Sequence, residues 1–398
     1  MLSPELKILA LVATAKGDPG EDLQLGNFIS QGVDAGLLVE MARKEGLAGL
    51  LYRSLQQSDL LESLGNRHRA RLQSLYYGTA ATNLKLTHEF KTVLQLANRE
   101  KIPIVLLQGI ALLRQVYPDP GLRPITDIDL WILPRDLPRL AAMLVSLGYE
   151  RDQLYPTTFK KGSVIFDLHP HLLWADRVRA LGLLLPGSQE DLYHSTRLVD
   201  FDGEPVFSLS PSDQVIHLIL HALKHGVSRL IWLVDIARLL ARWNSTQWQE
   251  LLNRARELGQ EQAISQALFL LAELLEVQPF PQTSQIPSTF RIHPLVKRML
   301  KGRVLGAPLP RWAYPVLLSS GKSWPTRLAV IFESLFPRPK ILRQVFPDSP
   351  ACGAWRLYAR RVVQLLGMMM GPWRQGAGRR EHRSRIGQWR ASSMKSGV

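Results

Sequence analysis

The segment that most constrains the fold of this chain is TDIDLWIL, residues 126–133, where two acidic side chains alternate with aliphatic ones. Successive side chains of a β-strand point to opposite faces, so a strand here would place Asp127 and Asp129 on one face, with Cβ atoms about 6.5–7 Å apart. The aliphatic side chains between them would face a core. The chain therefore needs a sheet with one buried face and one face that carries acids.

The segments around this strand alternate between strand and helix patterns, which predicts a small α/β unit. IPIVLL at 102–107 is typical of a strand buried on both faces, and Gly109 follows it closely. Later, a hairpin that turns at Lys161 and Gly162 leads into a strand carrying Asp167. The remaining segments are a helix at 110–117, a loop with three prolines at 118–124, and a helix that starts at Pro134 and ends at Gly148.

Helical patterns flank this unit on both sides, so we expect a mixed α+β fold. The stretch 80–98 lacks Gly and Pro and predicts one long helix, and Ser210 before Pro211 predicts a helix start. The predicted regions are N-terminal helices at 1–100, the α/β core at 101–208, helices packing on the core at 209–278, proline-interrupted helices at 279–375 with a proline-rich linker at 279–287, and a basic, disordered tail at 376–398.

The net charge of +15 in 398 residues is concentrated at the C-terminus. From Arg356 onward the chain has ten basic residues and one acid, Glu381. A tail of this kind is by default solubilising, and nucleic acid or an anionic membrane surface is its alternative partner. A single cysteine, Cys352, excludes an intramolecular disulfide, and the first residues lack a signal-peptide pattern, so we expect a cytoplasmic protein.

Three carboxylates can meet on the acidic face of the sheet, namely Asp127, Asp129 and, if its strand pairs beside theirs, Asp167. Hard oxygen donors without companion cysteines suit Mg²⁺ or Mn²⁺ more than zinc. Two such ions would activate an attacking hydroxyl and offset the charge of a triphosphate during in-line displacement. Gly109, between a strand and a helix start, would let backbone amides approach phosphate.

The same spacing of two acids recurs at Asp200 and Asp202, where it predicts a different structure. Gly203 and Pro205 follow, which favours a hairpin with its turn at Asp202 and Gly203. An acid pair therefore indicates a metal site only together with the strand, glycine and helix before it and the third acid after it.

Three segments of the chain resemble the bacterial uncharacterised nucleotidyltransferase family, a branch of the polymerase-β-like nucleotidyltransferases. They are LLQGIALLRQVYPDPGLRPITDIDLWI at 106–132, IFDLHPHLLW at 165–174 and LSPSDQVIHLILHALKHGVSRLIWLVDIARLL at 209–240, with a weaker likeness in FPRPKILRQVFP at 336–347. The resemblance implies a polymerase-β-like core flanked by helices, with Asp127, Asp129 and Asp167 as ligands for Mg²⁺ or Mn²⁺ and a phosphate loop led by Gly109.

The resemblance also implies a nucleotide-binding set around the acids. Two positions depart from the family's pattern: Gln108 stands where the family usually has Lys, and Ile110 stands where the wider superfamily has Ser. The missing serine removes a hydroxyl that would contact phosphate. The expected nucleotide-binding residues are Gly109, Gln108, Arg123, His221, Lys224 and His225, with Arg229 beside them.

The three histidines of the helical segment, His217, His221 and His225, share one helix face because they are four residues apart. They could ligate a metal, but no nearby cysteine or carboxylate completes a zinc set. The other interpretations are a polar helix face that touches phosphate or base, and a half-buried helix whose histidines are satisfied internally.

Two further charged residues allow more than one interpretation. Arg123, four residues before Asp127, could grip triphosphate oxygens with two hydrogen bonds or could be an exposed loop arginine. Asp235 lies inside the apolar run IWLVDIARLL, so a buried carboxylate there needs a partner. Arg238 or a histidine of the preceding helix is the expected one, in a structural role.

Together these features favour a metal-dependent nucleotidyltransferase that moves a nucleoside monophosphate from a triphosphate, with ATP expected, to an acceptor hydroxyl or phosphate. Asp167 would help to deprotonate the acceptor while Asp127 and Asp129 hold the metals. Family members accompany genes for surface polysaccharide or peptide natural products, which implies such an acceptor. The alternatives are a catalytically weak nucleotide-binding or scaffold protein, membrane-peripheral through its basic tail, and an enzyme that adenylates or tails RNA.

Overall fold

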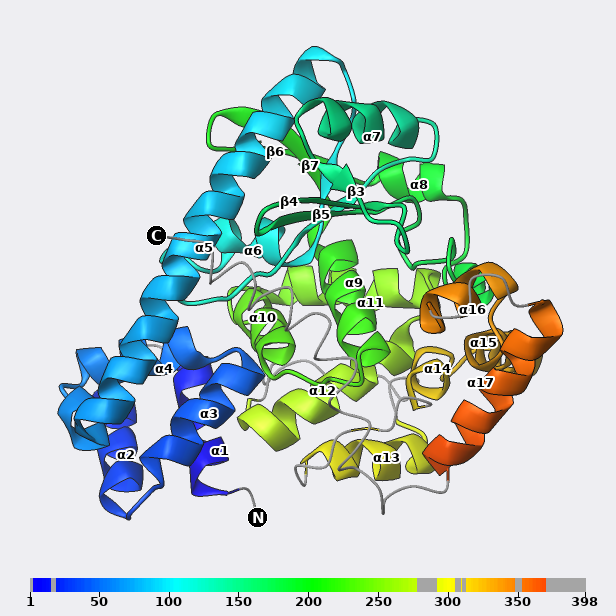
Figure 1. Cartoon of the computed structure of the whole chain (residues 1–398). Helices are drawn as coiled ribbons and strands as arrows, with labels where there is room; N and C mark the ends of the chain where they lie inside the picture. Colours follow the sequence, from blue (N-terminus) through cyan, green and yellow to red (C-terminus); the bar gives the residue numbers. More distant parts are fainter. Residues whose placement is uncertain are drawn as a thin grey trace. The chain divides into compact units, whose positions relative to one another are not determined.

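Seven strands of the described chain pair into one mixed sheet, in the order β3-β4-β5-β2-β1-β7-β6 (Figure 1). The computed structural model describes residues 3–15, 19–277, 292–304, 309, 313–347 and 353–369. The strands are β1 (Val105–Leu106), β2 (Ile128–Trp131), β3 (Glu150–Arg151), β4 (Thr158–Lys161), β5 (Val164–His169), β6 (Arg197–Phe201) and β7 (Glu204–Ser208).

The centre of the sheet has one apolar face and one acidic face. β2 and β5 run parallel as neighbours, and their register places Asp129 opposite Asp167. The aliphatic and aromatic side chains that alternate with these acids, including Leu130 and Phe166, are fully buried in a core on the other face. The predicted division of faces and the predicted neighbour strand are both confirmed.

Both predicted hairpins form, and each turns where the sequence indicates. Gly162 between β4 and β5 has a φ of 58°, and Asp202 and Gly203 between β6 and β7 have φ values of 53° and 88°. Positive φ at the turn matches the twist of the flanking strands. The Asp200 carboxylate accepts a hydrogen bond from the Gly203 amide at 3.1 Å, so this acid pair belongs to a turn, as predicted.

One long helix, α5 (Gly65–Arg99), links the N-terminal helices to the sheet (Figure 1). Its first half packs against α3 (Ala35–Glu45) and α4 (Ala48–Gln57), and its second half against β5 and β7. The sequence predicts a helix only over 80–98, but the helix continues through Gly78 to Gly65. Packing against α3 and α4 outweighs the cost of a glycine inside the helix.

We expect Gly78→Ala to raise the free energy of unfolding by about 1 kcal/mol, because alanine is the better helix former. An added Cβ at Gly78 meets no atom within 4 Å. Gly49→Ala in α4 is the matched control: its Cβ would overlap the backbone of Gly121 and Leu122, so it should destabilise the protein. Urea unfolding of both variants measures the difference, and a loss of stability at Gly78 would contradict the role assigned to packing.

Two predicted elements are shorter in the structure. In the run 102–107, only Val105 and Leu106 pair as a strand, because Pro103 has no N–H to donate to a ladder. The helix predicted from Pro134 is α7 (Leu137–Ser146), and Pro138, not Pro134, lies in its first turn.

A layer of helices is built around α9 (Pro211–Lys224), which contacts α10, α11, α12 and α14. The Ser210 hydroxyl caps α9 by accepting a hydrogen bond from the Asp213 amide at 3.2 Å, which confirms the predicted helix start. The other helices are α1 (Pro4–Thr14), α2 (Pro19–Ser30), α6 (Gln108–Gln115), α8 (Gln189–His194), α10 (Ile231–Leu240), α11 (Ser245–Glu257), α12 (Glu261–Leu275), α13 (Pro294–Val304), α14 (Ala313–Leu318), α15 (Trp324–Leu335), α16 (Pro339–Val345) and α17 (Ala354–Met369).

The chain divides into two units, Met1–Ser334 and Leu335–Val398, and the first contains the whole sheet. The mixed α/β core with helices on both sides in sequence is confirmed, whereas the region boundaries at 100, 208 and 278 stay predictions. The proline-rich linker at 279–287, the basic tail at 376–398 and Cys352 lie outside the described residues. Among the described helices, none has the length and apolar character needed to cross a membrane.

Candidate functional site

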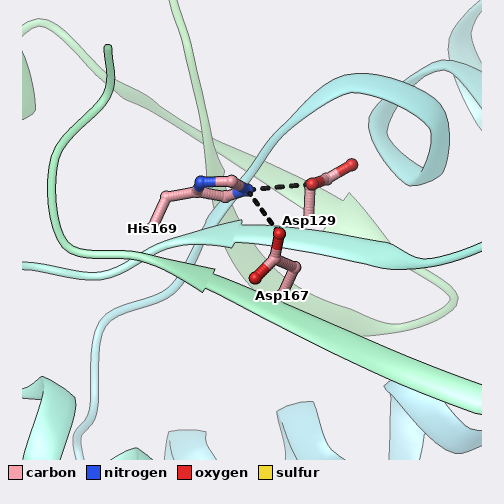
Figure 2. A group of neighbouring side chains, drawn as sticks. All are labelled: Asp129, Asp167 and His169. Atoms are coloured by element: carbon pink, nitrogen blue, oxygen red, sulfur yellow. Dashed lines mark hydrogen bonds and ion pairs between the residues drawn. The ribbon is translucent and has the colours of Figure 1, made fainter. Parts of the chain in front are cut away.

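Two acids and a histidine meet on the acidic face of the sheet, where β2 and β5 lie side by side (Figure 2). The Nε2 atom of His169 is 2.9 Å from Asp129 Oδ1 and 3.8 Å from Asp167 Oδ2. One ligand atom from each of the three residues lies within 4.8 Å of the other two. We call Asp129, Asp167 and His169 the acidic cluster.

His169 is a member of the cluster that the sequence analysis missed. It follows Asp167 by two residues on β5, so both side chains point to the same face of the strand. The spacing repeats the one between Asp127 and Asp129. The segment DLH at 167–169 therefore carried a signal that could have been read from alternation alone.

Asp127 lies beside the acidic cluster but is not part of it. It precedes β2 by one residue, and its carboxylate accepts a hydrogen bond from the Thr126 hydroxyl at 2.9 Å. Burial and the charge of Asp129 raise the pKa of Asp127 to about 7. The predicted trio therefore meets in one place, while the three closest donors are Asp129, Asp167 and His169. The roles of Asp127, Asp129 and Asp167 as metal ligands stay predictions.

Negative charge is in excess at the cluster. Burial raises the pKa of Asp167, and the charge of Asp129 adds to this effect. Burial disfavours a charged His169, but the hydrogen bond to Asp129 and the two carboxylates outweigh it and raise its pKa. Two half-buried carboxylates and one buried imidazole that lie close together are a donor set suited to a divalent cation.

The acidic cluster forms one wall of a pocket of about 280 Å³. Further lining residues come from the end of α9, the segment after it and the start of α10. All the predicted site residues line this pocket, so the structure brings them together, although their roles remain predictions. They are Asp127, Asp129, Asp167, Gln108, Gly109, Arg123, His221, Lys224 and His225; Arg229 also lines the pocket, as do Trp174, Arg177 and Trp232, which the sequence analysis did not single out.

Lys224 is a basic residue of the pocket lining whose protonation depends strongly on its surroundings. Its Nζ atom lies 3.3 Å from the ring centre of Trp174, a cation–π contact. Burial and the charge of Arg177 lower the pKa of Lys224 to about 7. The ammonium group therefore gains or loses its proton near neutral pH.

The histidines on the same face of α9 are neutral at neutral pH. Burial lowers the pKa of His221 well below its usual value and that of His225 to about 4. The ring of Trp232 lies 5.1 Å from His221 and 5.4 Å from His225, centre to centre. The pocket therefore offers flat aromatic surfaces here, and its positive charge comes from Lys224 and the arginines.

His217, on the same helix face, does not line the pocket. It is 2% exposed, its ring stacks on Trp174 at 5.8 Å, and neither ring nitrogen has a hydrogen-bond partner among the described residues. Burial lowers its pKa to about 3. The three histidines therefore do not act as one metal site: two face the pocket and one supports Trp174 from behind.

Arg123 and Asp235 form a buried ion pair, which corrects the partner predicted for Asp235. Nε and Nη2 of Arg123 lie 3.0 Å and 2.7 Å from the two carboxylate oxygens of Asp235, and the Tyr117 hydroxyl donates to the same carboxylate at 2.7 Å. Arg238 instead donates to the carbonyl of Ala13 at 3.1 Å. Arg123 is also not the exposed loop arginine of one interpretation, since it is 5% exposed.

The start of α6 places Gln108 and Gly109 at the pocket. Gln108 has a φ of 50°, a conformation that costs a non-glycine residue about 1 kcal/mol and that is common at functional sites. A Cβ at Gly109 would overlap the side chains of Ile125 and Arg123. Glycine is thus required here for packing against the arginine, in addition to any close approach of phosphate.

Comparison with known proteins points to one family. A family model described as "Uncharacterised nucleotidyltransferase" matches residues 31–276, more than half of the chain. No curated protein matches the chain. Among solved structures, an antigenic nucleotidyltransferase-like protein from Paracoccidioides brasiliensis is similar over 48% of this chain and 92% of that one, at 16% identity and a TM-score of 0.30, a likeness too low to carry an argument.

Proposed function

This chain belongs to the uncharacterised nucleotidyltransferase family, as the sequence motifs indicated, and from that premise we propose that its pocket transfers a nucleoside monophosphate from a nucleoside triphosphate to an acceptor hydroxyl or phosphate. One observation carries the proposal: the acidic cluster lines one pocket together with Lys224 and Arg229. Phosphoryl transfer is catalysed by positive charge held around the phosphates, which a cation at the cluster and these two basic side chains would supply.

Asp129, Asp167 and His169 would hold a divalent cation, with Asp127 as the next donor. Their oxygen-rich set with one imidazole suits Mg²⁺ or Mn²⁺. Such an ion, when bound, offsets charge on the phosphates and favours in-line attack. The raised pKa of Asp127 supports this assignment, because a nearby cation would relieve the repulsion among the carboxylates.

The protein's own residues would then orient the two substrates. Lys224 and Arg229 would bind triphosphate oxygens, and the aromatic rings of His225 and Trp232 would stack on the base. Asp167 Oδ would accept the proton of the acceptor hydroxyl, since burial makes its carboxylate more basic than usual. ATP is the expected triphosphate, and a glycan or peptide intermediate the expected acceptor.

Calorimetric titration of ATP and the other triphosphates with Mg²⁺, together with pyrophosphate release over a panel of acceptors, tests this function. We expect metal-dependent binding and turnover in the native protein and the loss of both in Asp129→Ala. Asp200→Ala removes an acid of the same local spacing from the β6–β7 turn and should change neither. Equal activity in Asp129→Ala and the native protein would contradict the proposal.

A second candidate function, a nucleotide-binding or scaffold protein with little turnover, is favoured by the residues of the phosphate loop. Gln108 and Ile110 stand where the family and its superfamily usually place Lys and Ser. Metal-dependent ATP binding without pyrophosphate release over all acceptors would select this candidate, because the acidic cluster would then serve binding alone.

Nucleotide binding above neutral pH is expected to take up a proton at Lys224 Nζ. At about pH 8 most Lys224 side chains are neutral, and a bound triphosphate raises the pKa and so draws a proton. At about pH 6 the side chain is already charged, so uptake at this group should vanish. Titrations of ATP in buffers with different ionisation enthalpies measure the uptake.

The control for this prediction is Lys224→Arg, which keeps the positive charge but does not titrate in this range. The variant should bind ATP without the part of the proton uptake that belongs to Lys224. Unchanged uptake in the variant would assign the proton to another group of the pocket, such as Asp127.

A further inference from the structure

One side of α17, the orange-red helix labelled in Figure 1, carries exposed apolar side chains. Trp355 and Val363 are each 70% exposed and Leu366 is 51% exposed, whereas Leu357, on the other side of the helix, is fully buried. The exposed positions Trp355, Val362, Val363 and Leu366 are spaced by seven, one and three residues, so they form one stripe along the helix. We call these four residues the α17 stripe.

The charges that the described part of α16 and α17 carries are all positive. Arg356 and Arg360 are exposed and lie next to the stripe, one helical turn apart. The guanidinium of Arg356 lies over the Trp355 ring, 5.2 Å from its centre. Residues 354–369 contain no acid, and neither does α16, which carries Lys340 and Arg343.

We propose that α17 binds an anionic lipid surface, with the stripe among the lipid headgroups and acyl chain ends and the arginines on lipid phosphates. An apolar stripe with a purely basic border matches such a surface in both respects. Tryptophan at the stripe is suited to the boundary between lipid and water. With sixteen residues the helix is about 24 Å long, so it lies along the bilayer without crossing it.

Other occupants fit the α17 stripe less well. A second copy would bring its own Arg356 and Arg360 next to these, so like charges would oppose pairing. Nucleic acid would satisfy the arginines and leave the apolar stripe in water. Lipid binding by α17 does not depend on the nucleotidyl transfer proposed above.

Flotation of the full chain with lipid vesicles tests the proposal. The vesicles contain either phosphatidylcholine alone or equal parts of phosphatidylcholine and phosphatidylglycerol. We expect binding to the anionic vesicles only. The paired changes Val363→Glu with Leu366→Glu, and Arg356→Glu with Arg360→Glu, should each weaken it about tenfold or more.

Matched controls make the same changes elsewhere. Leu84→Glu with Leu198→Glu alters two apolar side chains that are 60% and 64% exposed on α5 and β6. Arg67→Glu with Arg71→Glu alters two exposed arginines with the same spacing on α5. Both control variants should bind anionic vesicles as the native chain does, because neither changes α17.

Three outcomes would overturn the proposal. In the first, the α17 variants bind anionic vesicles as tightly as the native chain, so that another segment binds lipid. In the second, neutral and anionic vesicles are bound equally. In the third, the Val363→Glu with Leu366→Glu variant no longer forms an oligomer in sedimentation but binds vesicles as before, which would mean that the stripe contacts a second copy. Loss of binding confined to the two α17 variants supports it.

Discussion

Asp167→Asn is expected to lower metal-dependent pyrophosphate release by about a thousandfold and to leave the protein folded. A bound cation supplies several kcal/mol of charge stabilisation in the transition state, and about 4 kcal/mol corresponds to three factors of ten in rate. The amide keeps the size of the carboxylate and can still accept the hydrogen bond from the Thr158 hydroxyl, now at 3.0 Å. Asp200→Asn in the β6–β7 turn is the control and should retain full activity.

The same change should raise stability at neutral pH in the absence of metal. The folded protein raises the pKa of Asp167, so the protonated form of this carboxyl group favours the folded state. Its contribution to stability is fully present below the pKa of the unfolded chain, near 3.8. It is lost as the pH rises through the folded pKa. Removing the carboxylate removes that loss, and the gain should disappear in strong acid. Melting curves against pH check the sign, and a variant that is equally active and no more stable would contradict both the metal role and the crowding of charge.

The sequence predicted the centre of the site because alternation in a strand is a local property. Asp127 and Asp129 are two residues apart, so their common face could be read from 126–133 alone. Their neighbour Asp167 was predicted from a second strand pattern, and the parallel pairing of β2 with β5 confirms it. Alternation also places His169 on the same face as Asp167, a relation as local as that between Asp127 and Asp129.

The partners that cross the fold could not be predicted in this way. Arg123 and Asp235 are 112 positions apart, and no pattern near either one names the other. The sequence indicated that a buried Asp235 needs a cation, and Arg238 was the nearest in the helix. Tertiary packing decided otherwise, because the loop before β2 lies against α10 and brings Arg123 to the carboxylate.

The length of α5 is a second feature that local sequence preference does not predict. The predicted helix covers 80–98 only, because glycine, here Gly78, has a low local preference for the interior of a helix. Contacts with α3 and α4 override it, and these depend on how three helices pack. Local patterns therefore predicted which faces are polar, whereas packing set where elements end and which charges pair.

The buried pair of Arg123 and Asp235 should be the most sensitive point for stability. The side chains of Arg123 and Asp235 are 6% and 0% exposed. Removing one partner therefore leaves the other as a buried charge with neither water nor a counter-ion. We expect Arg123→Met and Asp235→Leu each to lower the free energy of unfolding by about 3–5 kcal/mol. The double variant should be markedly more stable than the sum of the two losses predicts, because no buried charge is left unpaired.

Urea unfolding of the two single variants and the double variant measures this coupling. The surface pair of Arg135 and Glu190 is the matched control: its atoms are 2.7 Å apart, but its side chains are 60% and 48% exposed. Changing either partner there should cost less than about 1 kcal/mol, since water screens the charges. Additive losses at Arg123 and Asp235 would mean that each side chain acts through its own packing. The hydrogen bond from Tyr117 would then be enough to stabilise the Asp235 carboxylate. Strong coupling would make the pair the link that fixes the loop before β2 against α10, and with it the floor of the pocket beside Gly109.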